Sequence, residues 1–250
     1  MQGNRLSGES SPVKFGAAIP VMNEWRFLPA VAGQLLKVAD RCVVLRGERS
    51  LSGAEAPTLT PVPELDPRIE VVSGAWQSEH ETRNAGMEIL SDCDYVFTLD
   101  SDEICSERSL RLLADRCSGG DRAVFGKFQT YWKTPHYRID PPESIIAPLV
   151  VRRDVRFERL RMFSGEHVLV NLPLVYHLSY VRTDEEMQEK LRLFGHASEV
   201  VPDWFASVWK RWDGNQGLED LHPTHPPAFK RAVKVRDTEL LYILSSYGVK

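Results

Sequence analysis

The sequence lacks several features that define large classes of proteins. Nothing in its 250 residues approaches 18 consecutive apolar residues, so no segment is predicted to span a membrane. The polar residues 1–11 lack the apolar stretch of a signal peptide. Lys and Arg number 31 against 35 Asp and Glu, and this net charge of −4 argues against a protein that binds nucleic acid mainly by electrostatic attraction.

Cysteine is also scarce, and its spacing shows no metal-binding pattern. The four cysteines are Cys42, Cys93, Cys105 and Cys117, and no two of them form a C-x-x-C pair. A zinc cluster and a dense disulfide framework are therefore both poorly supported. Together with the missing signal peptide, this predicts reduced thiols and a cytoplasmic location.

What the sequence does contain is an alternation of strand-like and helix-like segments. At 42% hydrophobic and 26% charged residues, it has the composition of a globular protein with a real core. Short apolar runs predict strands over 15–19, 42–45, 69–72 and 95–99. Helical spacing predicts helices over 27–39, 78–90 and 106–117. This alternation is typical of a Rossmann-like, mostly parallel sheet with flanking helices.

The second half of the chain differs in character. Apolar runs predict strands over 123–132, 145–152 and 174–177, and helices are predicted from 183 and over 203–212 and 235–247. The predicted fold class is therefore α/β with a mixed α+β C-terminal half. We interpret 14–250 as a single domain with two subregions, 14–117 and 118–250, preceded by a flexible N-terminal tail over 1–13.

The most informative segment is the acidic turn Asp100-Ser101-Asp102, which directly follows an apolar strand. In open α/β sheets, ligands bind beyond the carboxyl ends of the strands, where this turn falls. Two carboxylates spaced i, i+2 in a loop can reach one hard cation. Mg²⁺ and Mn²⁺ prefer such oxygen ligands and keep positions for phosphate oxygens. The alternative is a solvated acidic turn that caps the next helix, but its position after a buried strand favours a metal site.

Three segments, in this order and at these intervals, resemble the motifs of family 2 glycosyltransferases of GT-A fold. They are AIPVMNE at 18–24, ETRNAG at 81–86 and LDSDE at 99–103. The resemblance covers residues 14–117 and is looser in the second half, where it runs through YHLSYVR at 176–182. It implies that 14–117 binds a nucleotide-sugar donor and that 118–250 carries the acceptor side.

The same resemblance implies a set of metal and donor residues. Asp100, Asp102 and His177 would hold Mn²⁺ or Mg²⁺, which would neutralise the charge on a departing diphosphate. The donor nucleotide would be contacted by Pro20, Asn23, Glu24, Arg83, Asn84, Ser101 and Arg182. The family often has an acidic residue at the end of the second strand, where this sequence has LRG at 45–47. The identity of the nucleotide base is therefore open.

An inverting enzyme needs a base that takes the proton of the acceptor hydroxyl. Glu166 is the predicted base, because Gly165 lets the backbone come close and strand-like sequence follows. Asp140 and Asp184 are rivals, although Asp184 is better explained as a first-turn acid that the helix dipole favours. Aromatic residues such as Trp132 suit either an acceptor groove or core packing.

Two other functions stay open from the sequence. A nucleotidyltransferase also uses acidic loops with metal, but it normally has a Gly-rich, basic loop after its first strand, and 20–29 has no glycine. A catalytically silent GT-A-like module would bind a glycan or protein without metal, and the retained D-x-D argues against it. The acceptor is open among a glycan, a small molecule, a protein and a modified base of phage DNA, with the acidic net charge weighing against the last.

Overall fold

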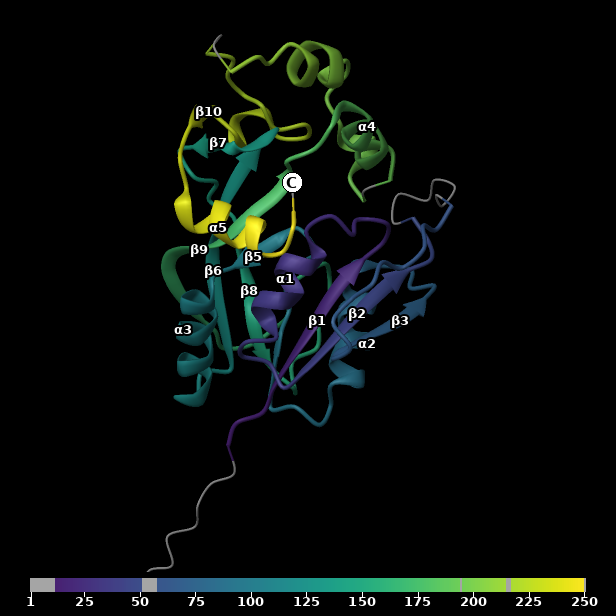
Figure 1. Ribbon diagram of the computed structural model, residues 1–250, viewed down its shortest axis with the longest axis vertical. Helices are drawn as coiled ribbons and strands as arrows, with labels where there is room; N and C mark the ends of the chain where they lie inside the picture. Colours follow the sequence, from purple (N-terminus) through teal and green to yellow (C-terminus); the bar gives the residue numbers. More distant parts are fainter. Residues whose placement is uncertain (1–11, 51–57, 194, 215–216, 250) are drawn as a thin grey trace, which may run out of the picture.

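The computed structural model describes residues 12–50, 58–193, 195–214 and 217–249, so nearly all of the predicted tail, 1–13, lies outside the described residues. Within these ranges the strands are β1 (Phe15–Val21), β2 (Arg41–Gly47), β3 (Ile69–Gly74), β4 (Tyr95–Phe97), β5 (Glu103–Cys105), β6 (Ala123–Trp132), β7 (Thr134–Asp140), β8 (Ile146–Arg152), β9 (Val168–Tyr180) and β10 (Arg231–Lys234). The helices are α1 (Leu28–Leu35), α2 (Glu79–Ile89), α3 (Glu107–Ser118), α4 (Asp184–Leu193) and α5 (Thr238–Ser246) (Figure 1). No helix in the described ranges is long and apolar enough to cross a membrane.

The central sheet changes from parallel to mixed at β4. Its strand order is β10-β7-β6-β8-β4-β1-β2-β3. The strands β4, β1, β2 and β3 run parallel to one another, whereas β8 runs antiparallel to both β4 and β6. Strand β9 lies off this path, parallel to β6 and antiparallel to the short β5. The predicted α/β class, with a parallel first half and a mixed second half, is confirmed.

Helices cover both faces of the parallel strands β1, β2 and β4, whose residues are mostly buried, as expected for strands between two helical layers. Helices α1, α3 and α5 pack on one face, with Leu28, Leu110 and Leu240 in the largest core cluster (Figure 1). Helix α2 packs on the other face through Met87 and Leu90. The loops between these layers are thereby gathered at the carboxyl ends of β1, β2 and β4.

The tryptophans of the second half form a separate aromatic cluster. Trp132, Trp204 and Trp209 are fully buried, and the ring centroids of Trp132 and Trp209 lie 5.1 Å apart at an interplanar angle of 63°. This cluster packs the segment after α4 against the end of β6. Trp132 therefore serves core packing and does not line an acceptor groove.

Most helix starts were predicted correctly from local sequence patterns. The Ser78 side chain accepts a hydrogen bond from the backbone N–H of Glu81 at 3.3 Å, so Ser78 is the N-cap of α2, at the predicted first residue of this helix. Three predictions for the second half differ from the structure. Strand β9 has 13 residues and extends well beyond 174–177, because both β6 and β5 pair with it. Strands β7 and β10 pair along a sheet edge, although no strand was predicted over either range. Residues 203–212 contain a π-helical turn over Phe205–Lys210.

Candidate active site

The acidic turn lies where the parallel strands end. Asp100 and Asp102 follow β4, and Pro20 lies near the end of β1, directly beside Leu45 of β2. Because β4, β1 and β2 are parallel, the loops that follow them meet at one edge of the sheet. Thr98, two residues before Asp100, holds the start of the turn against β8, because its backbone N–H donates to the Leu149 carbonyl oxygen at 3.0 Å.

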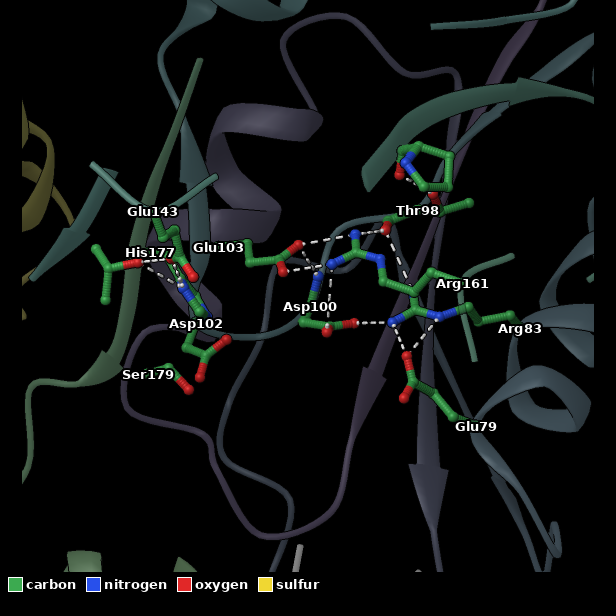
Figure 2. A network of polar contacts seen from close by, with 12 residues as sticks. Glu79, Arg83, Thr98, Asp100, Asp102, Glu103, Glu143, Arg161, His177 and Ser179 are labelled. Atoms are coloured by element: carbon green, nitrogen blue, oxygen red, sulfur yellow. Dashed lines mark hydrogen bonds and ion pairs between the residues drawn. The ribbon is translucent and has the colours of Figure 1, made fainter. Parts of the chain in front are cut away.

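Asp100, whose side chain is 33% exposed, belongs to a network of ionic side chains, called here the Asp100 network: Glu79, Arg83, Asp100, Glu103 and Arg161 (Figure 2). Arg83, whose side chain is 2% exposed, donates to Asp100 Oδ1 and to Glu79 Oε1, each at 2.7 Å. Its second terminal nitrogen donates to the Thr98 carbonyl oxygen at 3.2 Å. These three acceptors hold the guanidinium against the strand end.

Arg161 completes the network from the segment that follows β8. Its guanidinium forms an ion pair with the buried Glu103 and donates to the Thr98 carbonyl oxygen at 2.7 Å. A terminal nitrogen also lies 3.7 Å from Asp100 Oδ2. Glu103 in turn accepts the backbone N–H of Asp100 at 3.0 Å. Both oxygens of Asp100 therefore face arginines.

The charges of the network determine the ionisation of Asp100. Burial raises the pKa of this carboxyl, but the positive charges of Arg83 and Arg161 more than offset it, so its pKa is lowered. The carboxylate is thus stable as an anion without any metal. Asp100 is better suited to fixing the turn than to binding a cation, because a metal would compete with two arginines for its oxygens.

Asp102 lies in different surroundings, called here the Asp102 cluster: Asp102, His177, Ser179, Arg182 and Lys190. Its side chain is 10% exposed, and its nearest cations are distant, with Arg182 at 3.7 Å and Lys190 at 4.0 Å from Oδ2. In the described part of the chain, the carboxylate accepts no hydrogen bond. Asp102 is therefore held near the cavity with its oxygens open to a ligand.

Two cations of this cluster, Arg182 and Lys190, are buried, and the Asp102 carboxylate lies no closer than 3.7 Å to either. Burial lowers the pKa of Arg182 to about 10. Burial, followed by the neighbouring charge of Arg182, lowers the pKa of Lys190 to about 8. Lys190 donates to the Ser179 hydroxyl at 2.5 Å, and Arg182 forms an ion pair with Glu24. A bound anion would offset the free-energy cost of burying both positive charges. Arg182 and Lys190 therefore favour a phosphate ligand.

His177 lines the same cavity from β9. Its Nδ1 lies 3.1 Å from Thr130 Oγ1 and 3.4 Å from Glu143 Oε1, both behind the ring. Burial lowers the pKa of the imidazole, but the Glu143 hydrogen bond and the negative charge of Asp102 outweigh it, so the pKa is raised. Figure 2 shows Asp102, Ser179 and His177 together on one side, apart from the Asp100 network.

Two adjoining cavities open at this edge of the sheet. The first has a volume of about 510 Å³, the size range of small-molecule ligand sites, and is lined by residues that include Pro20, Arg83, Ser101 and His177. The second has a volume of about 370 Å³ and lies between the β1–α1 loop and α4. The lining that they share consists of Met22, Glu24, Ser101, Asp102 and Lys190. The Asp102 cluster thus stands where the cavities meet.

The structure brings most of the predicted donor residues to these cavities. Pro20 and Arg83 line the first cavity, Arg182 lines the second, and Glu24 and Ser101 line both. Asn23 lines the second cavity, but its side chain donates to the Thr58 carbonyl oxygen at 3.1 Å and accepts the Thr60 N–H at 3.2 Å, which holds the loop over 58–60.

Asn84 and Glu166 lie outside both cavities. The Asn84 amide makes two hydrogen bonds of 2.9 Å with the backbone of Phe157, so it anchors the 155–157 segment to α2. Glu166 is exposed and precedes the first residue of β9, whereas His177 is the tenth. Val168 and His177 pair with Val124 and Thr130 of β6, which are six residues apart, so at about 3.3 Å per residue the start of β9 lies roughly 20 Å from His177. The structure therefore does not bring the predicted base to the acidic turn.

The residues that the structure describes can supply some of the ligands of Mg²⁺ or Mn²⁺, but not a full set. Among the described residues, no three histidine, cysteine or carboxylate side chains are grouped to hold a metal ion by themselves. Asp102 and His177 can supply two ligands, and Mg²⁺ is commonly held by one or two carboxylates together with phosphate oxygens of the substrate. The site therefore suits a metal that arrives with a diphosphate.

Several site residues were not predicted from the sequence. Lys190 had a weak signal, because it shares the buried helix face of Met187 at i+3, where an apolar residue is expected. Arg161 and Glu143 had none, since their partners lie tens of residues away in the chain, and Glu103 belongs to the motif at 99–103 but was given no role. Their roles depend entirely on how the sheet assembles.

No protein-family model and no curated protein sequence matches the chain. Among solved structures, it is similar to S. aureus TarS 1–349 at 13% identity and a TM-score of 0.44, covering 72% of this chain and 64% of that one. It is also similar to glucosyl-3-phosphoglycerate synthase from Mycobacterium tuberculosis, solved with Mg²⁺ and uridine diphosphate, at 16% identity and a TM-score of 0.34. That match covers 48% of this chain and 44% of the other. Likeness at this level leaves the function to be inferred from the chain's own residues.

Proposed function

We propose that this protein is a glycosyltransferase of GT-A fold, family 2-like, that moves a sugar from a nucleotide-diphosphate donor to a hydroxyl acceptor with inversion. The observation that carries the proposal is the Asp102 cluster. An open carboxylate, a histidine and two buried cations stand at the carboxyl ends of parallel strands, beside a cavity of about 510 Å³. The motif resemblance supports the same reaction class.

The donor diphosphate would bind at the Asp102 cluster. Asp102 and His177 would hold Mn²⁺ or Mg²⁺, which supplies Lewis-acid stabilisation of the departing diphosphate when bound. Lys190 and Arg182 would donate charge-assisted hydrogen bonds to phosphate oxygens from the other side. The Asp100 network would keep the turn rigid, so that these groups need not reorganise as negative charge develops on the leaving group.

The nucleoside would lie in the first cavity, beyond the ends of β1 and β2. Pro20 and Ser78 line that part of the cavity, as does the indole of Trp76. An aromatic face there suits a nucleobase. Arg46, which stands in place of the acidic residue common in the family, donates to the Thr60 carbonyl oxygen at 2.6 Å and does not line the cavity. The base would be recognised by other groups.

The nucleotidyltransferase and the silent binding module fit the site less well. The loop over 20–29 forms no glycine-rich phosphate cradle, and its Arg26 lies at the Glu186 side of the second cavity. A binding module has no need of a carboxylate that accepts no hydrogen bond from a described residue and that stands beside two buried cations. Both alternatives predict that no sugar is transferred or hydrolysed from any nucleotide sugar.

The proposal is tested by a screen of nucleotide sugars with Mn²⁺ or Mg²⁺, using wild type and Asp102→Asn. We expect metal-dependent turnover of one donor class. Asp102→Asn should lower it roughly 100- to 1000-fold, as does loss of one preorganised group that stabilises transition-state charge. Glu166→Gln is the matched carboxylate-to-amide control, and its exposed position outside both cavities predicts unchanged transfer.

Three outcomes would contradict parts of this proposal. Wild type that neither binds nor turns over any donor with metal present would exclude the glycosyltransferase. Turnover that is equal with and without chelator would remove the metal. A product anomer that matches the donor, determined by proton NMR of the transferred sugar, would exclude inversion.

A further inference from the structure

One buried carboxylate, Glu143, belongs neither to the Asp100 network nor to the cavity lining. It follows β7 in the turn before β8, and the residue is 5% exposed. It accepts a hydrogen bond from the Thr130 hydroxyl, and its Oε1 lies 3.4 Å from Nδ1 of His177. A charged group at this depth requires such partners, because burying an unpaired carboxylate is costly.

The sheet brings these three side chains together from distant parts of the chain. Thr130 of β6 lies opposite His177 of β9 in the register of the two strands, so both side chains project to the same face. Glu143 approaches that face from the side away from the cavity. Figure 2 shows Glu143 next to His177, on the side of the ring away from Asp102.

The contacts determine which ring nitrogen is free. A carboxylate only accepts hydrogen bonds, and the Thr130 hydroxyl already donates to Glu143. The proton between the ring and this pair must therefore reside on Nδ1 of His177, which lies 3.4 Å from Glu143 Oε1. In the described part of the chain, Nε2 takes part in no hydrogen bond, so its lone pair is available on the cavity side.

We infer that Glu143 is a positioning residue that holds His177 as the Nδ1-protonated tautomer and presents Nε2 to the cavity as a ligand for the divalent metal. This inference rests on the proposed function, since it assumes that the metal binds between His177 and Asp102. A carboxylate behind a ligating histidine fixes the ring and raises its basicity, and loss of such a partner costs roughly 10- to 100-fold in metal affinity.

The first measurement needs no metal. In protein labelled with ¹⁵N-histidine at pH 8, long-range ¹H–¹⁵N spectra report the tautomer of each of the seven histidines, and His177→Gln identifies the signal of His177. We expect the Nδ1–H form in wild type and a mixture of tautomers in Glu143→Gln. A wild-type His177 that carries its proton on Nε2 would overturn the inference, whatever the enzyme does.

The second measurement is Mn²⁺ affinity in the presence of uridine diphosphate, read from the electron paramagnetic resonance signal of free Mn²⁺. Glu143→Gln should weaken Mn²⁺ binding about 10- to 100-fold. Thr130→Val, which removes only the hydroxyl, should weaken it less. Asp237→Asn is the matched control, because Asp237 accepts the Tyr131 hydroxyl at 2.7 Å on the opposite face of β6.

These variants separate failure of the inference from failure of the proposed function. If Asp102→Asn leaves Mn²⁺ affinity unchanged, the metal site itself is excluded. If Asp102→Asn abolishes binding while Glu143→Gln matches wild type, the metal site stands and Glu143 has no positioning role. If Glu143→Gln does not fold, as judged by circular dichroism, Thr130→Val decides, and unchanged affinity together with an unchanged tautomer overturns the inference.

Discussion

The two aspartates of the D-x-D turn are two residues apart in the chain and each has two cations within 4 Å, but only Asp100 accepts a direct hydrogen bond from one of them. Asp100 has arginines on both oxygens, at 2.7 and 3.7 Å, and its charge is neutralised within the fold. Asp102 has no cation closer than 3.7 Å. A satisfied ionic group stabilises a structure, whereas an unsatisfied one beside a cavity is poised for a ligand. One D-x-D motif can therefore use its first carboxylate to stabilise the fold and its second to bind a ligand.

The largest expected effect is a loss of stability when the Asp100 network is disrupted. Arg161→Met should lower the free energy of unfolding by about 3–5 kcal/mol, because it leaves Glu103 buried without its cation. Urea denaturation followed by circular dichroism measures this change. Arg152→Met is the matched control, since it removes an exposed ion pair with Asp154 and should cost about 0–1 kcal/mol. Equal losses in both variants would show that the Asp100 network contributes nothing special.

The next effect compares the two aspartates directly. Asp100→Asn should cost roughly 1.5–3 kcal/mol of stability, the range for a hydrogen bond to a charged group, while retaining most Mn²⁺ affinity. Asp102→Asn should show the reverse, with near-normal stability and lost Mn²⁺ binding. Urea denaturation and Mn²⁺ titration of both variants provide the measurement. A larger loss of metal affinity in Asp100→Asn would make Asp100 the principal ligand.

A smaller effect probes the cations that face Asp102. Lys190→Met should weaken binding of uridine diphosphate about 10-fold, because it removes one charge-assisted hydrogen bond to phosphate. Stability should not fall, since the substitution also removes the cost of burying an ammonium. Isothermal titration measures the affinity, with Lys210→Met as the control at an exposed lysine that pairs with Asp184. Unchanged affinity in Lys190→Met would remove Lys190 from the phosphate site.

The smallest effect is an absence of reaction at the cysteines. All four are free and buried, and burial raises the pKa of Cys42 and of Cys117 to about 12. Because the thiolate is the reactive form, almost none is present at pH 8, well below these pKa values. Native protein should therefore resist iodoacetamide, and protein in urea should take up four equivalents by mass spectrometry. Rapid alkylation of the native fold would show that a thiol reaches the surface.

Predicted residues that local sequence signals could position lie at the cavities, whereas residues whose position depends on distant parts of the chain do not. The D-x-D turn, Pro20 and Arg83 were placed correctly at one edge because local signals identified the strands and helix that carry them. Asn84 had an equally good motif, but its amide was already paired with the backbone of Phe157, 73 residues away. Glu166 was chosen from its neighbours in the chain, and these said nothing about which end of β9 faces the acidic turn.

The cytoplasmic location stays a prediction, as does the division of 14–250 into a donor half and an acceptor half. The free cysteines agree with a reducing environment without establishing one. One sheet runs through both halves, with β8 paired to β4 and to β6. The two parts are thus joined by backbone hydrogen bonds rather than by a linker.

By itself, the sequence determined the alternation of strands and helices, the starts of α2 and α3, and the position of an acidic turn after a buried strand. These features depend on residues within a few positions of one another, through apolar periodicity and side-chain caps. Only the tertiary structure decided that Arg83 and Arg161 neutralise Asp100, that Asp102 stays open beside Lys190, and that Glu143 stands behind His177. Those pairings join strands and loops tens of residues apart, and desolvation at the assembled sheet edge sets their strength.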